Sequence, residues 1–368
     1  MRSPEPSLPA PARLVAVALL LAVLTGGVVG VDGYGRARRL RMKNKVLEMF
    51  YHAYDNYMTY GFPLEHLPQD YNGSALTLVE SLSSLVILGN ITEFERGILW
   101  LSENLTFDVD VRINLFECNI RLLGGLISAH LLAKDYSSQL KNGLYHDQLL
   151  HLAESLGNRF LPAFETPTGL PYAWINLKVH IQNFGFSQTS KGIIVCMDQS
   201  FTGSLILEMG VLSRLTGDSR YEAAALRALR KLWSMRSSLN LVGTTLDVFT
   251  GKWIGYSSGI GAGVDSFYEY LIKAYILFGS DEYWDMFHAA YLAVQKYHEA
   301  DMRTGEATHW QLTSLQAFWP GLVVLPERYL LDYGMLHPTE KYYPLRPEFA
   351  ESTFYLYQAT KGVPKRPI

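Results

Sequence analysis

The residues of this sequence whose type and spacing could do chemistry are acidic side chains that open predicted helices. Glu117 is the first of them, and Arg121 follows one helical turn later on the same face. A Glu that opens a buried helix either satisfies the helix dipole or serves as a functional acid. Spacing alone favours the interaction with the helix dipole. At this point Glu117 is therefore no more than a candidate for a functional acid.

A glycine-rich loop leads to the second candidate, Asp265. The loop reads GIGAGVD over residues 259–265, and Glu269 follows Asp265 by one helical turn. Asp is a common helix N-cap, and this alone would explain its place. Glycine-rich loops also bind phosphate groups, but no strand clearly precedes this loop and no Lys follows it. The pattern therefore excludes a nucleotide site.

The remaining candidates lie further along the chain. Arg346, Glu348 and Glu351 crowd the first turn of a predicted helix, and Glu327 lies in the loop LPERY at residues 325–329. Acidic residues are common at helix N-termini for electrostatic reasons. The candidate carboxylates nevertheless share one placement, at the point where a loop meets a helix. In a barrel of helical hairpins, such junctions could converge at one end.

The elements that must position these acids are predicted to be helices. Apolar residues recur at three- and four-residue spacing in segments separated by Gly, Pro, Asn and Asp. The predicted helices span residues 46–60, 76–88, 115–132, 149–160, 201–215, 221–233, 266–278, 283–297, 312–325 and 349–359. Residues 241–253 are richer in Val, Thr and Gly and predict a hairpin or an extended loop. An all-α fold follows, as a closed helical barrel or an open solenoid.

Composition restricts the function classes. The chain has 368 residues, 48% of them hydrophobic, which is enough for a sizeable core in one helical domain. Aromatic residues make up 13% of the chain, and such side chains pack cores but also line carbohydrate sites. The formal net charge of −3 and the lack of a long basic run exclude nucleic acid as a partner.

The first 31 residues look like a targeting sequence. Arg2 and Arg13 precede an apolar run over residues 14–31 that contains small residues, as in a signal peptide. If it is not cleaved, the same run could just anchor the chain, although the basic cluster that follows is on the wrong side for a type II anchor. We therefore divide the chain into a signal peptide or anchor (1–31), a basic lead-in (32–44) and a helical domain (45–368).

Sequons support delivery to a lumenal compartment, where N-glycans are added. The three sequons begin at Asn72, Asn90 and Asn104. The only cysteines are Cys118 and Cys196, which rules out a disulfide scaffold and leaves one bridge or two free thiols.

Several long motifs in this chain resemble those of one enzyme family. Residues 116–126, 261–266 and 345–352 resemble acidic motifs of the class I α-1,2-mannosidases, glycoside hydrolase family 47. Residues 49–58, 161–172 and 318–329 resemble the branch named ER degradation-enhancing α-mannosidase-like proteins. The resemblance extends from about Lys43 to Lys361, in the same motif order.

The resemblance implies a fold, an activity and a site. The fold is an (α/α)7 barrel with its site at one end. The activity is hydrolysis, with inversion, of terminal α-1,2-linked mannose on N-glycans of misfolded glycoproteins, which feeds ER-associated degradation from the ER lumen or membrane. A bound calcium ion helps to hold the sugar, and an oxidoreductase or a chaperone is an expected partner. The implied catalytic residues are Glu117, Asp265, Glu327 and Glu348, and the implied substrate-binding residues are Arg121, Arg346 and Glu351.

Inversion assigns the acids different roles. One protonated carboxyl must assist the leaving group, and one carboxylate must activate a water molecule, with the pair roughly 6.5–9.5 Å apart. We expect Glu117 to be the acid and Glu348 the base. Asp265 remains an alternative water-activating or water-bridged residue.

The chain also departs from the family pattern. Ser83 stands where the family has an acid, and Leu325 runs directly into Pro326 where the family has an intervening helix. The family's calcium-ligating Thr lies beyond Ile368, so no metal ligand is assigned, and calcium binding by this chain is doubtful. The departures predict an incomplete barrel with weak or no hydrolysis and poor stability. The alternative functions are a mannose-glycan or misfolded-client binding protein and a helical-repeat interaction protein.

Overall fold

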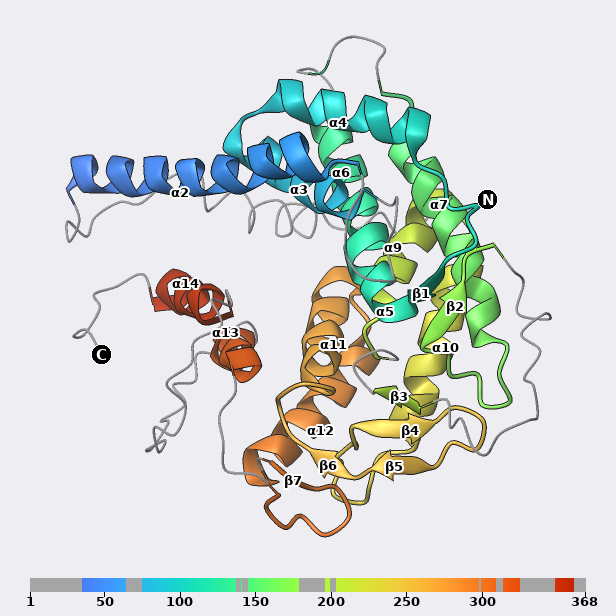
Figure 1. Cartoon of the computed structure of the whole chain (residues 1–368). Helices are drawn as coiled ribbons and strands as arrows, with labels where there is room; N and C mark the ends of the chain where they lie inside the picture. Colours follow the sequence, from blue (N-terminus) through green and yellow to red (C-terminus); the bar gives the residue numbers. More distant parts are fainter. Residues whose placement is uncertain are drawn as a thin grey trace, which may run out of the picture. The chain divides into compact units, whose positions relative to one another are not determined.

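The computed structural model describes residues 35–63, 75–136, 140, 145–178, 196–198, 203–297, 299–308, 314–324 and 348–360. The chain divides into two compact units. One contains Met1–Thr106 with Gly125–Leu152, and the other contains Phe107–Gly124 with Ala153–Ile368 (Figure 1). Glu327, Arg346 and Asn72 lie outside the described residues.

The first unit is built on a helical hairpin. Its helices are α2 (Arg36–Asn56), the π-helical turn η1 (Tyr57–Gly61), α3 (Leu76–Leu88), α4 (Ile91–Asn104) and most of α6 (Gly124–Asp135). Leu82, Phe94 and Ile98 are fully buried where α3 meets α4. Gly97 permits this close approach, because a Cβ atom there would lie only 2.7 Å from Leu82 Cδ2.

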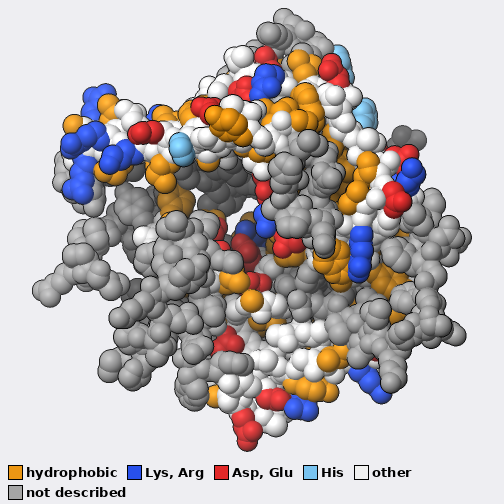
Figure 2. All heavy atoms as spheres, viewed as in Figure 1, with side chains coloured by type: hydrophobic (Ala, Val, Ile, Leu, Met, Phe, Trp, Pro, Cys, Tyr) orange, Lys and Arg blue, Asp and Glu red, His pale blue; other side chains and the backbone are white. Residues whose placement is uncertain are grey.

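Helix α2 carries the basic lead-in and continues into the predicted barrel domain. Its first half is exposed, and Figure 2 shows Lys and Arg side chains over it. Only Tyr54, near the end of α2, is buried, and its hydroxyl donates to Glu93 Oε1 at 2.6 Å. The predicted boundary at residue 44 therefore lies within one continuous helix, and the assignment of residues 1–31 stays a prediction.

Helix α4 is absent from our predicted helices, although local signals for it exist. Asn90 caps it, because its Oδ1 accepts from the backbone N–H of Glu93 at 3.1 Å, and Asn104 is its last residue. Two of the three sequons thus mark the two ends of one helix. Asn90 Nδ2 also donates to the Tyr51 hydroxyl at 3.0 Å, whereas Asn104 is exposed.

The two Asn residues should differ in their effect on stability. In unglycosylated protein, Asn90→Ala is expected to lower the free energy of unfolding by about 1 kcal/mol through loss of the cap. Asn104→Ala serves as the matched control and should change it little. Urea denaturation of both variants measures this difference, and equal losses would contradict the capping role of Asn90.

The second unit contains the remaining helices and three small antiparallel sheets. Its helical elements are α5 (Leu115–Cys118), η2 (Asn119–Leu123), α7 (Gln148–Phe160), η3 (Leu161–Phe164), α9 (Ile206–Thr216), α10 (Arg220–Ser234), α11 (Asp265–Phe278), α12 (Asp281–Tyr297), η5 (Ser314–Phe318), α13 (Trp319–Val324) and α14 (Glu348–Thr360). The first five residues of α7 belong to the other unit. The mainly helical structure confirms the all-α prediction.

The strands of the second unit are short. The pairs are β1 (Arg112–Asn114) with β2 (Trp174–Asn176), β4 (Thr245–Asp247) with β3 (Cys196–Asp198) and β5 (Trp253–Gly255), and β6 (Ser257–Ser258) with β7 (Ala300–Asp301). The β4–β5 pair confirms the predicted hairpin at 241–253. The other two sheets and strand β3 were not expected, because each joins segments far apart in the sequence.

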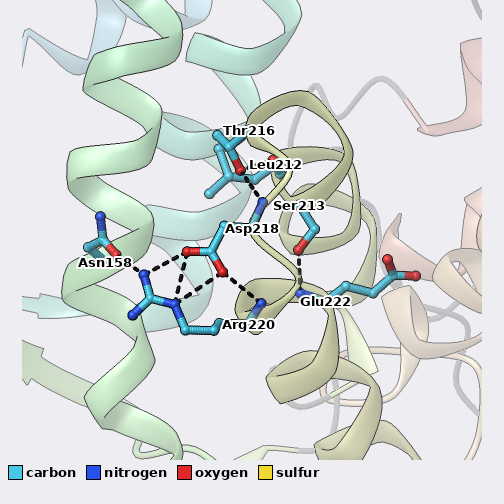
Figure 3. A network of polar contacts seen from close by, with 7 residues as sticks. All are labelled: Asn158, Leu212, Ser213, Thr216, Asp218, Arg220 and Glu222. Atoms are coloured by element: carbon cyan, nitrogen blue, oxygen red, sulfur yellow. Dashed lines mark hydrogen bonds and ion pairs between the residues drawn. The ribbon is translucent and has the colours of Figure 1, made fainter.

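The turn between α9 and α10 shows how local residues position helices in this unit. Gly217 adopts a φ of +78°, and the Thr216 hydroxyl accepts from the backbone N–H of Asp218 at 3.2 Å. Arg220 donates to the Asp218 carboxylate and, at 3.3 Å, to Asn158 Oδ1 on α7 (Figure 3). The turn thus fixes the connection of α9 to α10 and links it to α7.

Aromatic packing holds the start of α13 against α11 and α12. The Trp319 ring contacts Tyr268 of α11 edge to face at 5.4 Å and stacks on Tyr291 of α12 at 5.9 Å. Ser352 of α14 donates to the carbonyl of Ala317 at 2.6 Å and accepts from the Gly321 N–H at 3.0 Å. These contacts fix α14 to η5 and α13.

Candidate active site

Glu117 is positioned by a capped helix start. Asn114 Oδ1 accepts from the backbone N–H of Glu117 at 3.0 Å, and Arg121 Nε donates to Glu117 Oε2 at 2.7 Å. The side chains of Glu117 and Arg121 are 38% and 42% exposed. A partly exposed pair of this kind contributes little to stability, so its role here is to orient the Glu117 carboxylate.

Asp265 is the first residue of α11. Its Oδ1 accepts from the backbone N–H of Ser266 at 2.9 Å, and its own N–H donates to the Gly261 carbonyl at 3.0 Å. Burial raises the pKa of Asp265 above its ordinary value, and the nearby charge of Glu269 acts in the same direction. A carboxyl in such an environment holds a proton more readily than one in water.

A second group of charges links α11 to α14. Lys273 Nζ donates to Glu269 Oε1 at 2.5 Å. Burial would lower the pKa of Lys273, but Glu269 raises it above its ordinary value, so the ammonium stays charged. Burial also raises the pKa of Glu351, and the charge of Lys273 opposes that shift. Among the described residues, no donor reaches the buried Glu348 Oε2.

Glu208 of α9 is a site residue that our sequence analysis missed. Tyr270 Oη donates to Glu208 Oε1 at 2.8 Å, and Asn119 Nδ2 donates to Glu208 Oε2 at 2.8 Å. Burial raises the pKa of Glu208 to about 7. The available signal was an acid within the apolar stretch ILEMGVL of a predicted helix. That pattern alone cannot distinguish a solvent-facing carboxylate from one enclosed by other helices.

A network of polar contacts links the elements of the second unit that carry the described candidates. Glu208 connects the segment after Glu117 to α11 through Asn119 and Tyr270. Lys273 of α11 influences Glu351 of α14. The candidates carried by these elements are Glu117, Arg121, Asp265, Glu348 and Glu351. Each lies at the start of a helix or within its first two turns. The structure gives no view of Glu327 or Arg346.

No group of three or more His, Cys, Asp and Glu within the described ranges is arranged to hold a metal ion. Calcium is also bound by carbonyl oxygens and water, so the family's calcium ion stays an expectation for this chain. Cys118, next to Glu117, is a free and buried thiol, and burial raises its pKa.

One described helical run is long and apolar enough to cross a membrane. It spans Leu115–Asp135, and half of its most apolar window is buried within the protein. A core helix meets the same criteria, so this run is weak evidence for a membrane span.

Comparison with known proteins decides the family. The model of "Glycosyl hydrolase family 47" matches residues 49–338. The chain belongs to glycosyl hydrolase family 47. This family-47 chain is 60% identical over 408 residues to "Alpha-mannosidase I MNS5" of Arabidopsis thaliana, with 96% of the chain and 70% of that protein covered. It is 38% identical to human "ER degradation-enhancing alpha-mannosidase-like protein 2", with 94% and 66% covered.

Each of these alignments covers a larger share of this chain than of the relative. The chain spans 56% of the length of "Alpha-mannosidase I MNS4" from Arabidopsis thaliana, at 41% identity. The alignment with the MNS5 protein has 408 positions against 368 residues here, so at least 40 positions of that relative have no counterpart in this chain.

A solved structure supports the fold. The "alpha-1,2-mannosidase from Trichoderma reesei" matches with a TM-score of 0.68 at 22% identity, covering 87% of this chain and 66% of that one. This likeness confirms the helical-barrel fold class expected for a glycosidase of family 47. Where the family pattern has an acid, Ser83 instead lies 2.8 Å from the hydroxyl of Ser128, so a neutral pair joins α3 to α6.

Proposed function

We propose that this chain belongs to an enzyme that removes terminal α-1,2-linked mannose from N-glycans with inversion at the anomeric carbon. The observation that carries this proposal is the contrast among carboxyls that share neighbours in the second unit. Asp265 and Glu351 have raised pKa values, while Glu117 is paired with Arg121. Carboxyls whose environments differ in this way can serve as acid and base in one site.

The proposed roles follow from the match of each group to the family motifs. Glu117 is the acid that protonates the leaving oxygen once the sugar separates it from Arg121. Glu348 is the leading base that activates water, because its buried Oε2 accepts no hydrogen bond from the described residues and so keeps its capacity to accept one. Asp265 is the alternative partner of that water. We also assign Glu327 to catalysis and Arg121, Arg346 and Glu351 to sugar binding, by their match to family motifs.

The names of the relatives support a proposal for the compartment in which the enzyme acts. Several are called ER degradation-enhancing alpha-mannosidase-like proteins, including those of human and Schizosaccharomyces pombe. We infer that the substrates are N-glycosylated misfolded proteins in the ER lumen or at its membrane. An oxidoreductase or chaperone partner and the family's calcium ion stay part of this proposal.

A glycan-release assay tests the proposed function. The full chain is incubated with a high-mannose N-glycan, and the loss of hexose units is followed by mass spectrometry. We expect slow loss of α-1,2-linked mannose, since the departures from the family pattern predict weak hydrolysis, and proton NMR of the first product should show the β-anomer, as inversion requires. Glycan binding without any loss of hexose would instead support the mannose-binding alternative.

A further inference from the structure

We propose that Glu299 is a positioning residue that clamps the glycine-rich loop before Asp265 and ties it to the segment leading into α13. The inference rests on the proposed function for its catalytic consequence. The clamp itself is defined by geometry within the second unit, and Glu299, Ile260 and Gln316 lie outside the motifs that identified the family acids.

The Glu299 carboxylate accepts a hydrogen bond from the loop backbone, as a backbone carbonyl does in regular secondary structure. Its Oε1 accepts from the backbone N–H of Ile260 at 3.1 Å and from Gln316 Nε2 at 2.6 Å. Gln316 is 5% exposed and belongs to η5. One oxygen therefore joins the loop at 259–264 to η5 with two hydrogen bonds, each strengthened by the carboxylate charge.

The loop glycines make room for this clamp. A methyl group on Gly259 would overlap the Glu299 carboxylate, and one on Gly261 would lie 3.3 Å from Gln316 Nε2. Gly259 has no positive φ, so the space taken by Glu299 is the physical reason for a glycine there. The Tyr268 hydroxyl holds the other side of the loop by donating to the Gly259 carbonyl at 3.1 Å.

The clamp affects the positions of two candidate carboxylates, those of Asp265 and Glu348. The loop delivers Asp265, whose N–H donates to the carbonyl of Gly261. On the other side, η5 is fixed to α14 by the hydrogen bond from Ser352 to the Ala317 carbonyl. Because α14 begins at Glu348, Glu299 sets the position of Asp265 relative to Glu348. A displacement of about 1 Å in such a pair can cost about 10²-fold in rate.

Hydrogen exchange tests the clamp without reference to activity. In Glu299→Ala, the peptide containing residues 256–266 should exchange its amide protons faster than in the wild type. Glu299→Gln keeps an accepting oxygen and should restore slow exchange. Asp247→Ala is the control, since Asp247 binds the N–H of Phe249 in a different turn. Unchanged exchange in folded Glu299→Ala would overturn the proposal.

A double-mutant cycle provides the second test. Gly259→Ala should mimic Glu299→Ala by displacing the carboxylate, and it should add nothing in the Glu299→Ala background. Where mannose release is measurable, Glu299→Ala should lower kcat by about 10²-fold with little change in KM, and Glu299→Gln should retain most of the kcat. Additive effects of the two substitutions would refute the clamp. A wild type without mannose release would refute the proposed function and leave the exchange result to decide on the clamp.

Discussion

Replacing Glu117 with Gln should lower the release of mannose from an α-1,2-linked mannobiose by about 10²- to 10⁴-fold, which is the usual contribution of a general acid. Gln has the shape of Glu but cannot donate the proton that the leaving oxygen requires. The capping bond of Asn114 uses the backbone N–H of residue 117, so the helix start should survive the substitution. Glycan binding should be retained, as judged by calorimetry.

A substrate whose leaving group needs no protonation tests whether Glu117 acts as the general acid. α-D-mannosyl fluoride loses fluoride without acid assistance, so Glu117→Gln should hydrolyse it at close to the wild-type rate. Glu93→Gln is a matched control, because Glu93 also follows an Asn cap and pairs with an Arg, Arg96. Equal losses on the fluoride and the disaccharide would show that Glu117 acts on water or on the sugar, and unchanged release of mannose would remove it from the site.

Replacing Glu208 with Gln should flatten the dependence of stability on pH between about pH 4.5 and 7. The pKa of Glu208 is raised from its ordinary 4.5 to about 7, so the folded protein binds this proton more tightly than the unfolded chain does. Stability therefore falls as pH rises through this window. The total is on the order of 3 kcal/mol, since each pKa unit corresponds to about 1.4 kcal/mol.

Urea denaturation at several pH values measures this effect as a difference between wild type and variant. The difference in unfolding free energy should grow in favour of Glu208→Gln as pH rises, and it should level off above about pH 7. Glu282→Gln is the control of opposite sign. Arg230 lowers the pKa of Glu282, so the stability it contributes is lost only as pH falls below its ordinary range. Parallel curves for wild type and Glu208→Gln would contradict the raised pKa.

The sequence by itself determined most helices and the places of the acids. The predicted helix at 76–88 coincides with α3, and Asp265, Glu348 and Glu117 lie in the first turns of α11, α14 and α5. These features are local, because apolar periodicity and N-terminal caps act over a few residues. Helix α4 was missed although its Asn90 cap was readable in the sequence. The family was also recognisable, because whole motifs are preserved in order.

Only the tertiary structure decided which of these groups interact and in what state. Burial among the surrounding helices raises the pKa of Glu208 to about 7, although the hydrogen bonds from Asn119 and Tyr270, 89 and 62 residues away in the sequence, oppose that shift. Glu299 reaches Ile260 across 39 residues of sequence. The strand pair β3–β4 likewise joins distant segments. Desolvation and hydrogen bonding depend on what surrounds a side chain in space, and a one-dimensional pattern of residue types carries no measure of that environment.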